Sequence, residues 1–166
     1  MLEGKEVKKR VIVSANDANT GAYIHLPLHD MTDHKMITSA VVGSASIPFF
    51  FPPRDMKEFG LDAILIDGGT SWNNNLVSGV DECLKIDGIN DQSQIDVDII
   101  TLNGKHLPDF NIQEGDIPTT IQYYERKKEL NSFYHDYDDM IEFMEAFPRV
   151  NYRYYFQPDY VLLPGW

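Results

Sequence analysis

The residues best suited to chemistry in this chain are Asp67, Gly68 and Gly69, which come directly after the apolar run 63–66. A short run of β-forming residues that ends in an acid and two glycines predicts a buried strand that delivers one carboxylate to the edge of a sheet. Glycine has no Cβ, so the chain can turn sharply and another group can approach the carboxylate closely. Such a carboxylate can serve as a general base. Asp-Gly is also a common turn dipeptide, so an ordinary strand end is the alternative interpretation.

A second segment, residues 39–53, joins a helix of small residues to a rigid apolar corner. The helix is predicted to be capped by Thr32 or Asp33 and to run to about Ser46, because Ile47 precedes proline and is disfavoured in the helical region. Tight packing is the simple interpretation of its serines, since none has a base at helical spacing. The helix contains Ser39, Gly43, Ser44 and Ser46, and the corner is Phe49-Phe50-Phe51-Pro52-Pro53.

Together these segments resemble the carboxy-terminal half of the patatin-like phospholipases. In that family a Gly-rich oxyanion loop and a Gly-x-Ser-x-Gly elbow precede an "A-S-x-x-x-P-x-x-F-P-P" segment and a final Asp-Gly-Gly or Asp-Gly-Ala turn. The resemblance extends from Val11 to Phe156, and its specific parts are residues 44–53 and 67–75. It implies that Asp67 is the base of a Ser-Asp dyad. It also implies a set of residues that bind substrate or shape the site, namely Gly68, Gly69, Ser46, Pro48 and Phe51.

The chain contains neither a Gly-x-Ser-x-Gly sequence nor a Gly-rich oxyanion loop. An acyl hydrolase needs a nucleophilic serine, a base and backbone N–H donors for the oxyanion, so two of these components lie outside these residues. We therefore expect residues 1–166 to be one partial patatin-like domain, inactive alone and completed by an N-terminal segment or a subunit. A relict domain that has lost the reaction, or a non-catalytic interaction subunit on the same scaffold, is the alternative.

The pattern of apolar residues predicts an α/β fold. Runs without polar alternation are typical of strands that are covered on both faces. We expect a layered domain with a central, mostly parallel sheet flanked by helices and incomplete at its N-terminal side. The predicted elements are strands at 11–15, 22–26, 63–66, 95–102 and 150–156, a turn at 16–21 that joins the first two strands in a hairpin, and helices at about 77–86, 119–132 and 134–147.

Composition narrows the possible partners. With 26 acidic and 14 basic residues the net charge is -12, which argues against binding nucleic acid and against electrostatic capture by anionic lipid. Any membrane contact is therefore expected to be peripheral and apolar. The resemblance implies a lipid ester as substrate, from a phospholipid or an acylglycerol, and no cofactor.

The compartment is predicted from cysteine content and from the lack of targeting segments. The single cysteine, Cys83, excludes an intrachain disulfide and fits a reducing compartment. No apolar run reaches the roughly 18 residues that span a bilayer, and the first ten residues are too charged for a signal sequence. We expect an intracellular chain, cytoplasmic or peripheral at lipid surfaces.

Three histidines and an acid near residue 30 form a candidate metal site. The residues are His25, His29, Asp30 and His34. Histidine and carboxylate are common ligands of transition metals. Pro27 breaks the helix that would place His25 and His29 on one face, so no metal site is expected.

Overall fold

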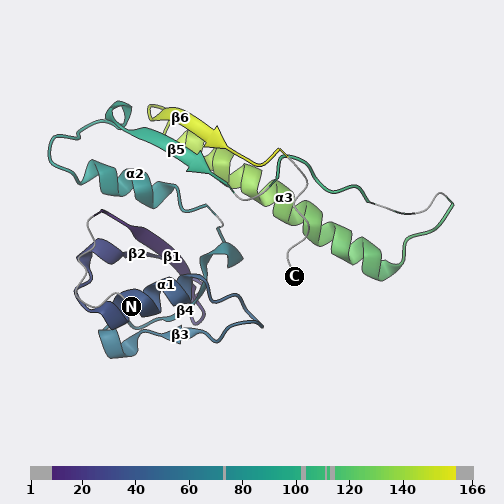
Figure 1. Cartoon of the computed structure of the whole chain (residues 1–166), viewed down its shortest axis with the longest axis horizontal. Coiled ribbons are helices and arrows are strands. Elements are labelled where there is room, and N and C mark those ends of the chain that lie inside the picture. Colours follow the sequence, from purple (N-terminus) through teal and green to yellow (C-terminus); the bar gives the residue numbers. More distant parts are fainter. Residues whose placement is uncertain (1–8, 73, 102–103, 111, 113–114, 160–166) are drawn as a thin grey trace. The chain divides into compact units, whose positions relative to one another are not determined.

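The computed structural model describes residues 9–72, 74–101, 104–110, 112 and 115–159. The chain divides into two compact units, Met1–Glu82 and Cys83–Trp166 (Figure 1). No helix in these described ranges combines the length and the apolar character needed to cross a membrane.

The first unit is built on a four-stranded sheet in the order β2-β1-β4-β3 (Figure 1). Every neighbouring pair in this sheet is antiparallel, and Ala15 of β1 lies opposite Asp67 of β4. The central position of β1 therefore sets the surroundings of Asp67. The strands are β1 (Ile12–Asp17), β2 (Tyr23–Pro27), β3 (Arg54–Asp55) and β4 (Ile64–Asp67). Three short 3-10 helices belong to the same unit: η1 (Leu28–Asp30) follows β2, η2 (Lys57–Phe59) lies between β3 and β4, and η3 (Gly68–Thr70) follows β4.

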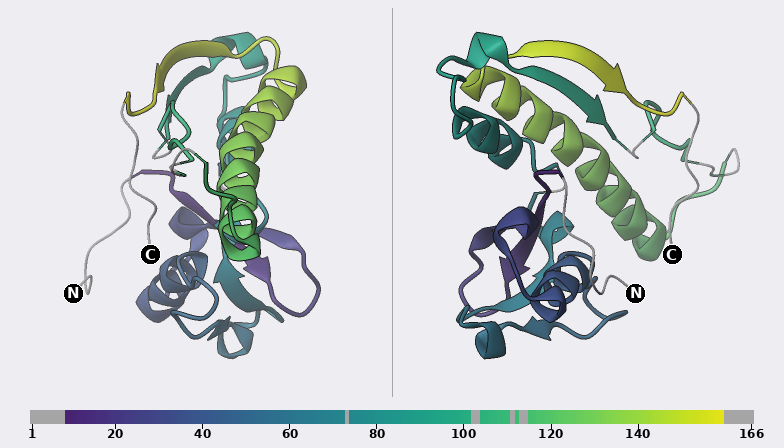
Figure 2. Two further views of the ribbon diagram at one scale, coloured as in Figure 1. Left: turned by 90° about the vertical axis from the view of Figure 1, so that its right-hand side faces the viewer. Right: turned by 60° about the vertical axis from the view of Figure 1, so that its left-hand side comes forward.

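Helix α1 (His34–Ser44) packs against β1 and β4 (Figure 2). Asp33 caps its amino terminus, because the side chain accepts a hydrogen bond from the Lys35 amide at 2.7 Å. Gly43 approaches β4 so closely that an added Cβ would lie 2.8 Å from the Cβ of Leu65. The buried core around this contact comprises Ala15, Leu26, Leu28, Ile37, Ala40, Met56, Ala63 and Leu65. Helix α2 (Val77–Leu84) contains the boundary of the unit, because the first unit ends at Glu82.

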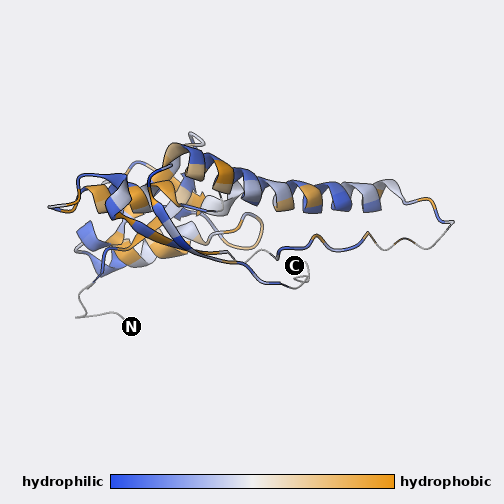
Figure 3. Cartoon of the chain, turned by 90° about the horizontal axis from the view of Figure 1, so that it is seen from above, coloured by the Kyte–Doolittle hydropathy of each residue, from blue (hydrophilic) through white to orange (hydrophobic). Residues whose placement is uncertain are grey.

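The second unit contains η4 (Gln92–Gln94), β5 (Asp96–Ile100), α3 (Thr120–Ala146) and β6 (Asn151–Phe156). Strands β5 and β6 pair in parallel, with an irregularity between Val97 and Asp98. Helix α3 begins with a capping box formed by Thr119 and Gln122. Hydrophilic residues recur along the whole of α3 (Figure 3), and its buried positions are Asp136, Asp139 and Phe143.

The prediction of a central, mostly parallel sheet layered between helices is wrong. The larger sheet is antiparallel throughout, and parallel pairing is confined to β5 and β6. The unbroken apolar runs correctly indicated strands, but strand direction depends on the connections between them. A short turn after β1 returns the chain as the antiparallel neighbour β2, and β4 then pairs antiparallel along the other edge of β1.

Two predicted elements also differ in extent. The helices expected at 119–132 and 134–147 form one continuous helix, α3, because no glycine or proline interrupts the sequence between them. The turn expected at 16–21 is shorter, since Asn16 and Asp17 belong to β1 and are buried. The strand expected at 95–102 is observed as β5, while Leu102 lies outside the described residues.

Asp17 closes the turn that follows β1. Its carboxylate accepts hydrogen bonds from the Thr20 hydroxyl at 2.6 Å and the Ile64 amide at 2.9 Å, and from the amides of Asn19 and Thr20. These bonds, led by that from the Thr20 hydroxyl, lower the pKa of Asp17 below its ordinary value of 3.8. The ionised form is therefore favoured by folding.

We expect Asp17→Asn to destabilise the first unit at neutral pH. We also expect the variant to lose less stability than wild type as the pH is lowered. A carboxylate whose pKa is lower in the folded state contributes stability above the unfolded-state pKa and loses it as pH falls through the folded-state pKa. Denaturant unfolding of wild type and variant between neutral pH and about pH 2 measures both effects. Asp62→Asn is the control, because that side chain is 89 % exposed. If the free energy of unfolding fell equally with pH for wild type and Asp17→Asn, the role given to the Asp17 carboxylate would be contradicted.

Candidate functional site

Asp67 is the last residue of β4, and the chain turns directly behind it into η3. Its Oδ1 atom accepts a hydrogen bond from the Gly69 amide at 2.7 Å, so the carboxylate caps this short helix. Within the described part of the chain, no other group donates a hydrogen bond to this carboxylate or forms an ion pair with it. Among the described residues, one carboxylate oxygen is thus held by the Gly69 amide and the other has no hydrogen-bond donor.

Ser46 joins the end of α1 to the Asp67 turn. The Asp67 amide donates to the Ser46 carbonyl at 3.0 Å. The Ser46 side chain is buried, and its hydroxyl donates to the Val42 carbonyl at 2.8 Å. Ser46 therefore shapes the site through its backbone, and its hydroxyl is engaged within the helix end. The two segments that carry the family resemblance are adjacent in the structure.

Asn16 is the residue at this site that the sequence analysis missed. Its side-chain amide donates to the carbonyl of Asp67 at 3.0 Å and to that of Gly68 at 3.2 Å. Asn16 is buried, and its Oδ1 atom has no hydrogen-bond partner among the described residues. The only sequence signal was a polar residue directly after an apolar strand, and its role depends on the β1–β4 pairing.

The two glycines behind Asp67 have different surroundings. Gly68 is buried against β1, and an added Cβ would lie 2.8 Å from the Ser14 carbonyl oxygen. The space beside Gly68 is therefore filled by protein. Gly69 is exposed and supplies the amide that caps the carboxylate. The Ser14 hydroxyl accepts a hydrogen bond from the Tyr23 hydroxyl at 2.7 Å, which adds a polar contact beside the turn.

Pro48 and Phe51 lie in an exposed turn directly after α1, not in a described cavity. The turn is tied to Ile47, whose carbonyl accepts from the amides of Phe50 and Phe51 at 3.2 and 3.0 Å. The structure therefore brings Ser46 together with Asp67, Gly68 and Gly69, and leaves Pro48 and Phe51 at the surface of the same unit.

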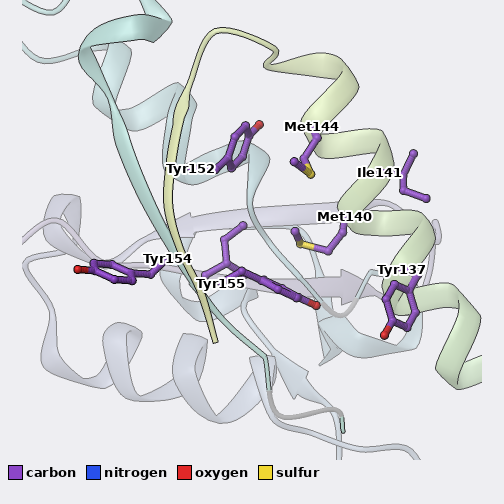
Figure 4. Close-up of a pocket in the computed structure, with 8 residues that line it drawn as sticks. Tyr137, Met140, Ile141, Met144, Tyr152, Tyr154 and Tyr155 are labelled. Carbon is purple, nitrogen blue, oxygen red and sulfur yellow. The ribbon is translucent and has the colours of Figure 1, made fainter. Parts of the chain in front are cut away.

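An apolar cavity of about 290 Å³ lies within the second unit, between α3 and the β5–β6 pair (Figure 4). Met140 and Met144 of α3 point toward β6 there. Burial raises the pKa of Tyr152 and of Tyr155, so both phenols stay neutral at physiological pH. With no charged side chain in its lining, the cavity suits an apolar group and offers no acid–base chemistry. It is lined by Ile99, Tyr137, Met140, Ile141, Met144, Tyr152, Tyr154 and Tyr155.

The histidines near residue 30 have separate surroundings. His29 Nε2 lies 3.3 Å from a carboxylate oxygen of Glu82 and 3.6 Å from one of Asp30. Glu82 also pairs with Arg10 at 3.0 Å. The ring of His25 contacts the ring of Tyr23 edge-on. Among the residues that the structure describes, no three potential metal-binding side chains gather at one point.

Comparison with protein-family models, curated proteins and solved structures found no match for this chain.

Proposed function

We propose that this chain carries the catalytic base of a lipid acyl hydrolase and that Asp67 is that base. The nucleophilic serine and the oxyanion donors are supplied by residues outside this chain, as the resemblance to patatin-like phospholipases suggests. The substrate is an ester of a phospholipid or an acylglycerol. The observation that supports the proposal most is the state of the Asp67 carboxylate, in which Gly69 fixes one oxygen while the other has no donor among the residues that the structure describes.

In the proposed reaction the serine hydroxyl donates a hydrogen bond to the open oxygen of Asp67. The carboxylate takes the proton while the serine oxygen attacks the ester carbonyl, and the protonated acid then delivers that proton to the departing alkoxide. Water attacks the acyl-serine in the second half, again losing its proton to Asp67. The serine leaves with that proton, and the fatty acid is released.

Three polar contacts orient the carboxylate for this role. The Asp67 amide is bound to Ser46, its carbonyl to Asn16 and its Oδ1 atom to Gly69. A base held at several points needs little further ordering before proton transfer. An ordinary strand turn needs no hydrogen bond to the segment that follows α1. The bond between the Asp67 amide and the Ser46 carbonyl therefore favours a positioned base over an ordinary turn.

The test joins this chain to an upstream segment that bears a Gly-x-Ser-x-Gly elbow and an oxyanion loop. We expect the joined protein to hydrolyse a short-chain p-nitrophenyl ester, while this chain and the segment are each inactive alone. The same fusion with its elbow serine replaced by alanine is the control. A joined protein that is folded by circular dichroism and yet inactive would contradict the proposal.

A second candidate is a non-catalytic interaction subunit. It is favoured by the β5–β6 pair, in which each strand has one neighbour and Ile100, Tyr154 and Phe156 are exposed. Parallel sheets are normally covered on both faces, and a strand with one neighbour can pair with a further strand along its other edge. The β5–β6 pair therefore suits a partner that adds strands. This candidate predicts a stoichiometric complex that lacks esterase activity and forms equally well with Asp67→Asn.

A further inference from the structure

We propose that residues 47–53, here named the apolar turn, insert into the surface of a lipid bilayer. This inference rests on the proposed lipid-ester function and adds to it the segment that contacts the membrane. The apolar turn is the sequence Ile47-Pro48-Phe49-Phe50-Phe51-Pro52-Pro53, which contains no polar side chain.

The side chains of the apolar turn project from the first unit. Phe49 is fully exposed, and Phe50 and Phe51 are 65 % and 56 % exposed. Three neighbouring exposed phenylalanines are unusual on a protein surface and indicate a contact surface. An exposed ring needs a matching pocket on a protein partner, whereas fluid lipid fits around it. The exposure of these three rings therefore favours lipid.

Phe49 also has a strained backbone. Its φ of 76° lies in the left-handed region, and among the described residues no other non-glycine has a positive φ. This conformation is costly for an aromatic residue, and strain of this kind persists mainly where function requires it. The residue with this backbone conformation is also the one in the turn whose side chain is fully exposed.

The backbone of the apolar turn has few N–H groups that need water. Its three prolines have none, and the amides of Ile47, Phe50 and Phe51 donate to carbonyls within residues 45–47. Of the N–H groups in this segment, only that of Phe49 has no acceptor among the described residues. Unpaired N–H groups are expensive to bury in lipid, so the pattern lowers the cost of insertion.

Insertion of the apolar turn would bring the Asp67 site to the lipid surface. Ile47 directly follows Ser46, whose carbonyl accepts the Asp67 amide. The net charge of -12 cannot favour anionic lipid, so the attraction must come from the apolar side chains. Binding to a zwitterionic bilayer should therefore be insensitive to salt.

The test measures co-flotation of the full chain with phosphatidylcholine vesicles. We expect wild type to float with the vesicles and Phe49→Gly to reduce the partition coefficient about tenfold, because one buried phenylalanine is lost. Glycine accepts the φ of residue 49 without strain, so the thermal midpoint of the variant should not fall. A loss of binding cannot then be attributed to unfolding.

Ile117→Gly is the matched control, because Ile117 is also an exposed apolar loop residue, at 89 %, and lies outside the apolar turn. This variant should bind vesicles as wild type does. The inference is overturned if wild type does not bind, if Phe49→Gly binds equally well, or if high salt abolishes binding. It is also overturned if Phe49→Gly weakens self-association of the chain and leaves vesicle binding unchanged, since the turn would then be a protein interface.

Asp67→Asn separates this inference from the proposed function. The variant should bind vesicles like wild type, because Asp67 lies outside the apolar turn. Vesicle binding without hydrolysis by the joined protein would leave the membrane contact standing and remove the catalytic proposal. Hydrolysis of soluble esters without vesicle binding would do the reverse.

Discussion

Replacing Asp67 with asparagine is expected to reduce the esterase rate of the joined protein about a thousandfold. An amide oxygen cannot take the serine proton, so the contribution of the general base is lost. The fold should be retained, because the asparagine oxygen can still accept the Gly69 amide that now binds Oδ1 at 2.7 Å. Asparagine is as good a helix cap as aspartate, so the substitution tests chemistry with little effect on structure.

Initial rates on a short-chain ester, together with thermal unfolding, measure this effect. Asp67→Ala should lose the same activity and also about 1 kcal/mol of stability, because the cap of η3 is removed. Asp62→Asn, at an exposed acid just before β4, should leave the rate unchanged. Wild-type activity in Asp67→Asn would exclude Asp67 as the base.

Replacing Gly68 with alanine is expected to lower the free energy of unfolding of the first unit by about 2–3 kcal/mol. The new Cβ would lie 2.8 Å from the Ser14 carbonyl oxygen and 3.1 Å from its carbonyl carbon. Both are backbone atoms of β1, which is paired on one side to β2 and on the other to β4. The strand cannot move without disturbing both pairings, so the turn that carries Asp67 must shift.

Urea unfolding followed by far-ultraviolet circular dichroism measures this loss. Gly79→Ala in α2 is the matched control, because no atom lies within 4 Å of an added Cβ there. That variant should be more stable by about 0.5–1 kcal/mol, since alanine is the better helix former. Equal stability of Gly68→Ala and wild type would show that the close packing of the turn on β1 is not present in solution.

The position of Asp67 could be predicted because local signals agree there. An apolar run that ends in an acid and two glycines specified a strand and a sharp turn, and β4 does end at Asp67. Pro48 restricts the residue before it and so bounded the predicted helix, but α1 ends at Ser44, two residues before the predicted end at about Ser46. The signals that were correctly interpreted at Asp67 act within a few residues of sequence.

The surroundings of Asp67 could not be predicted, because they depend on pairing between distant segments. The same apolar run suits a parallel or an antiparallel neighbour, so the sheet direction was wrongly assigned. Asn16 looked like a turn residue until β1 and β4 were paired, and only that pairing brings its amide to the carbonyls of Asp67 and Gly68. The role of Asn16 is thus a product of tertiary structure.

A crystal structure of the joined protein would test the role of Asp67 most directly. The account predicts that the elbow serine hydroxyl lies about 2.6–3.2 Å from the open Asp67 oxygen, with the Gly69 amide still bound to the other. A carboxylate that points away from the serine, or whose second oxygen is paired with an arginine or lysine, would contradict it.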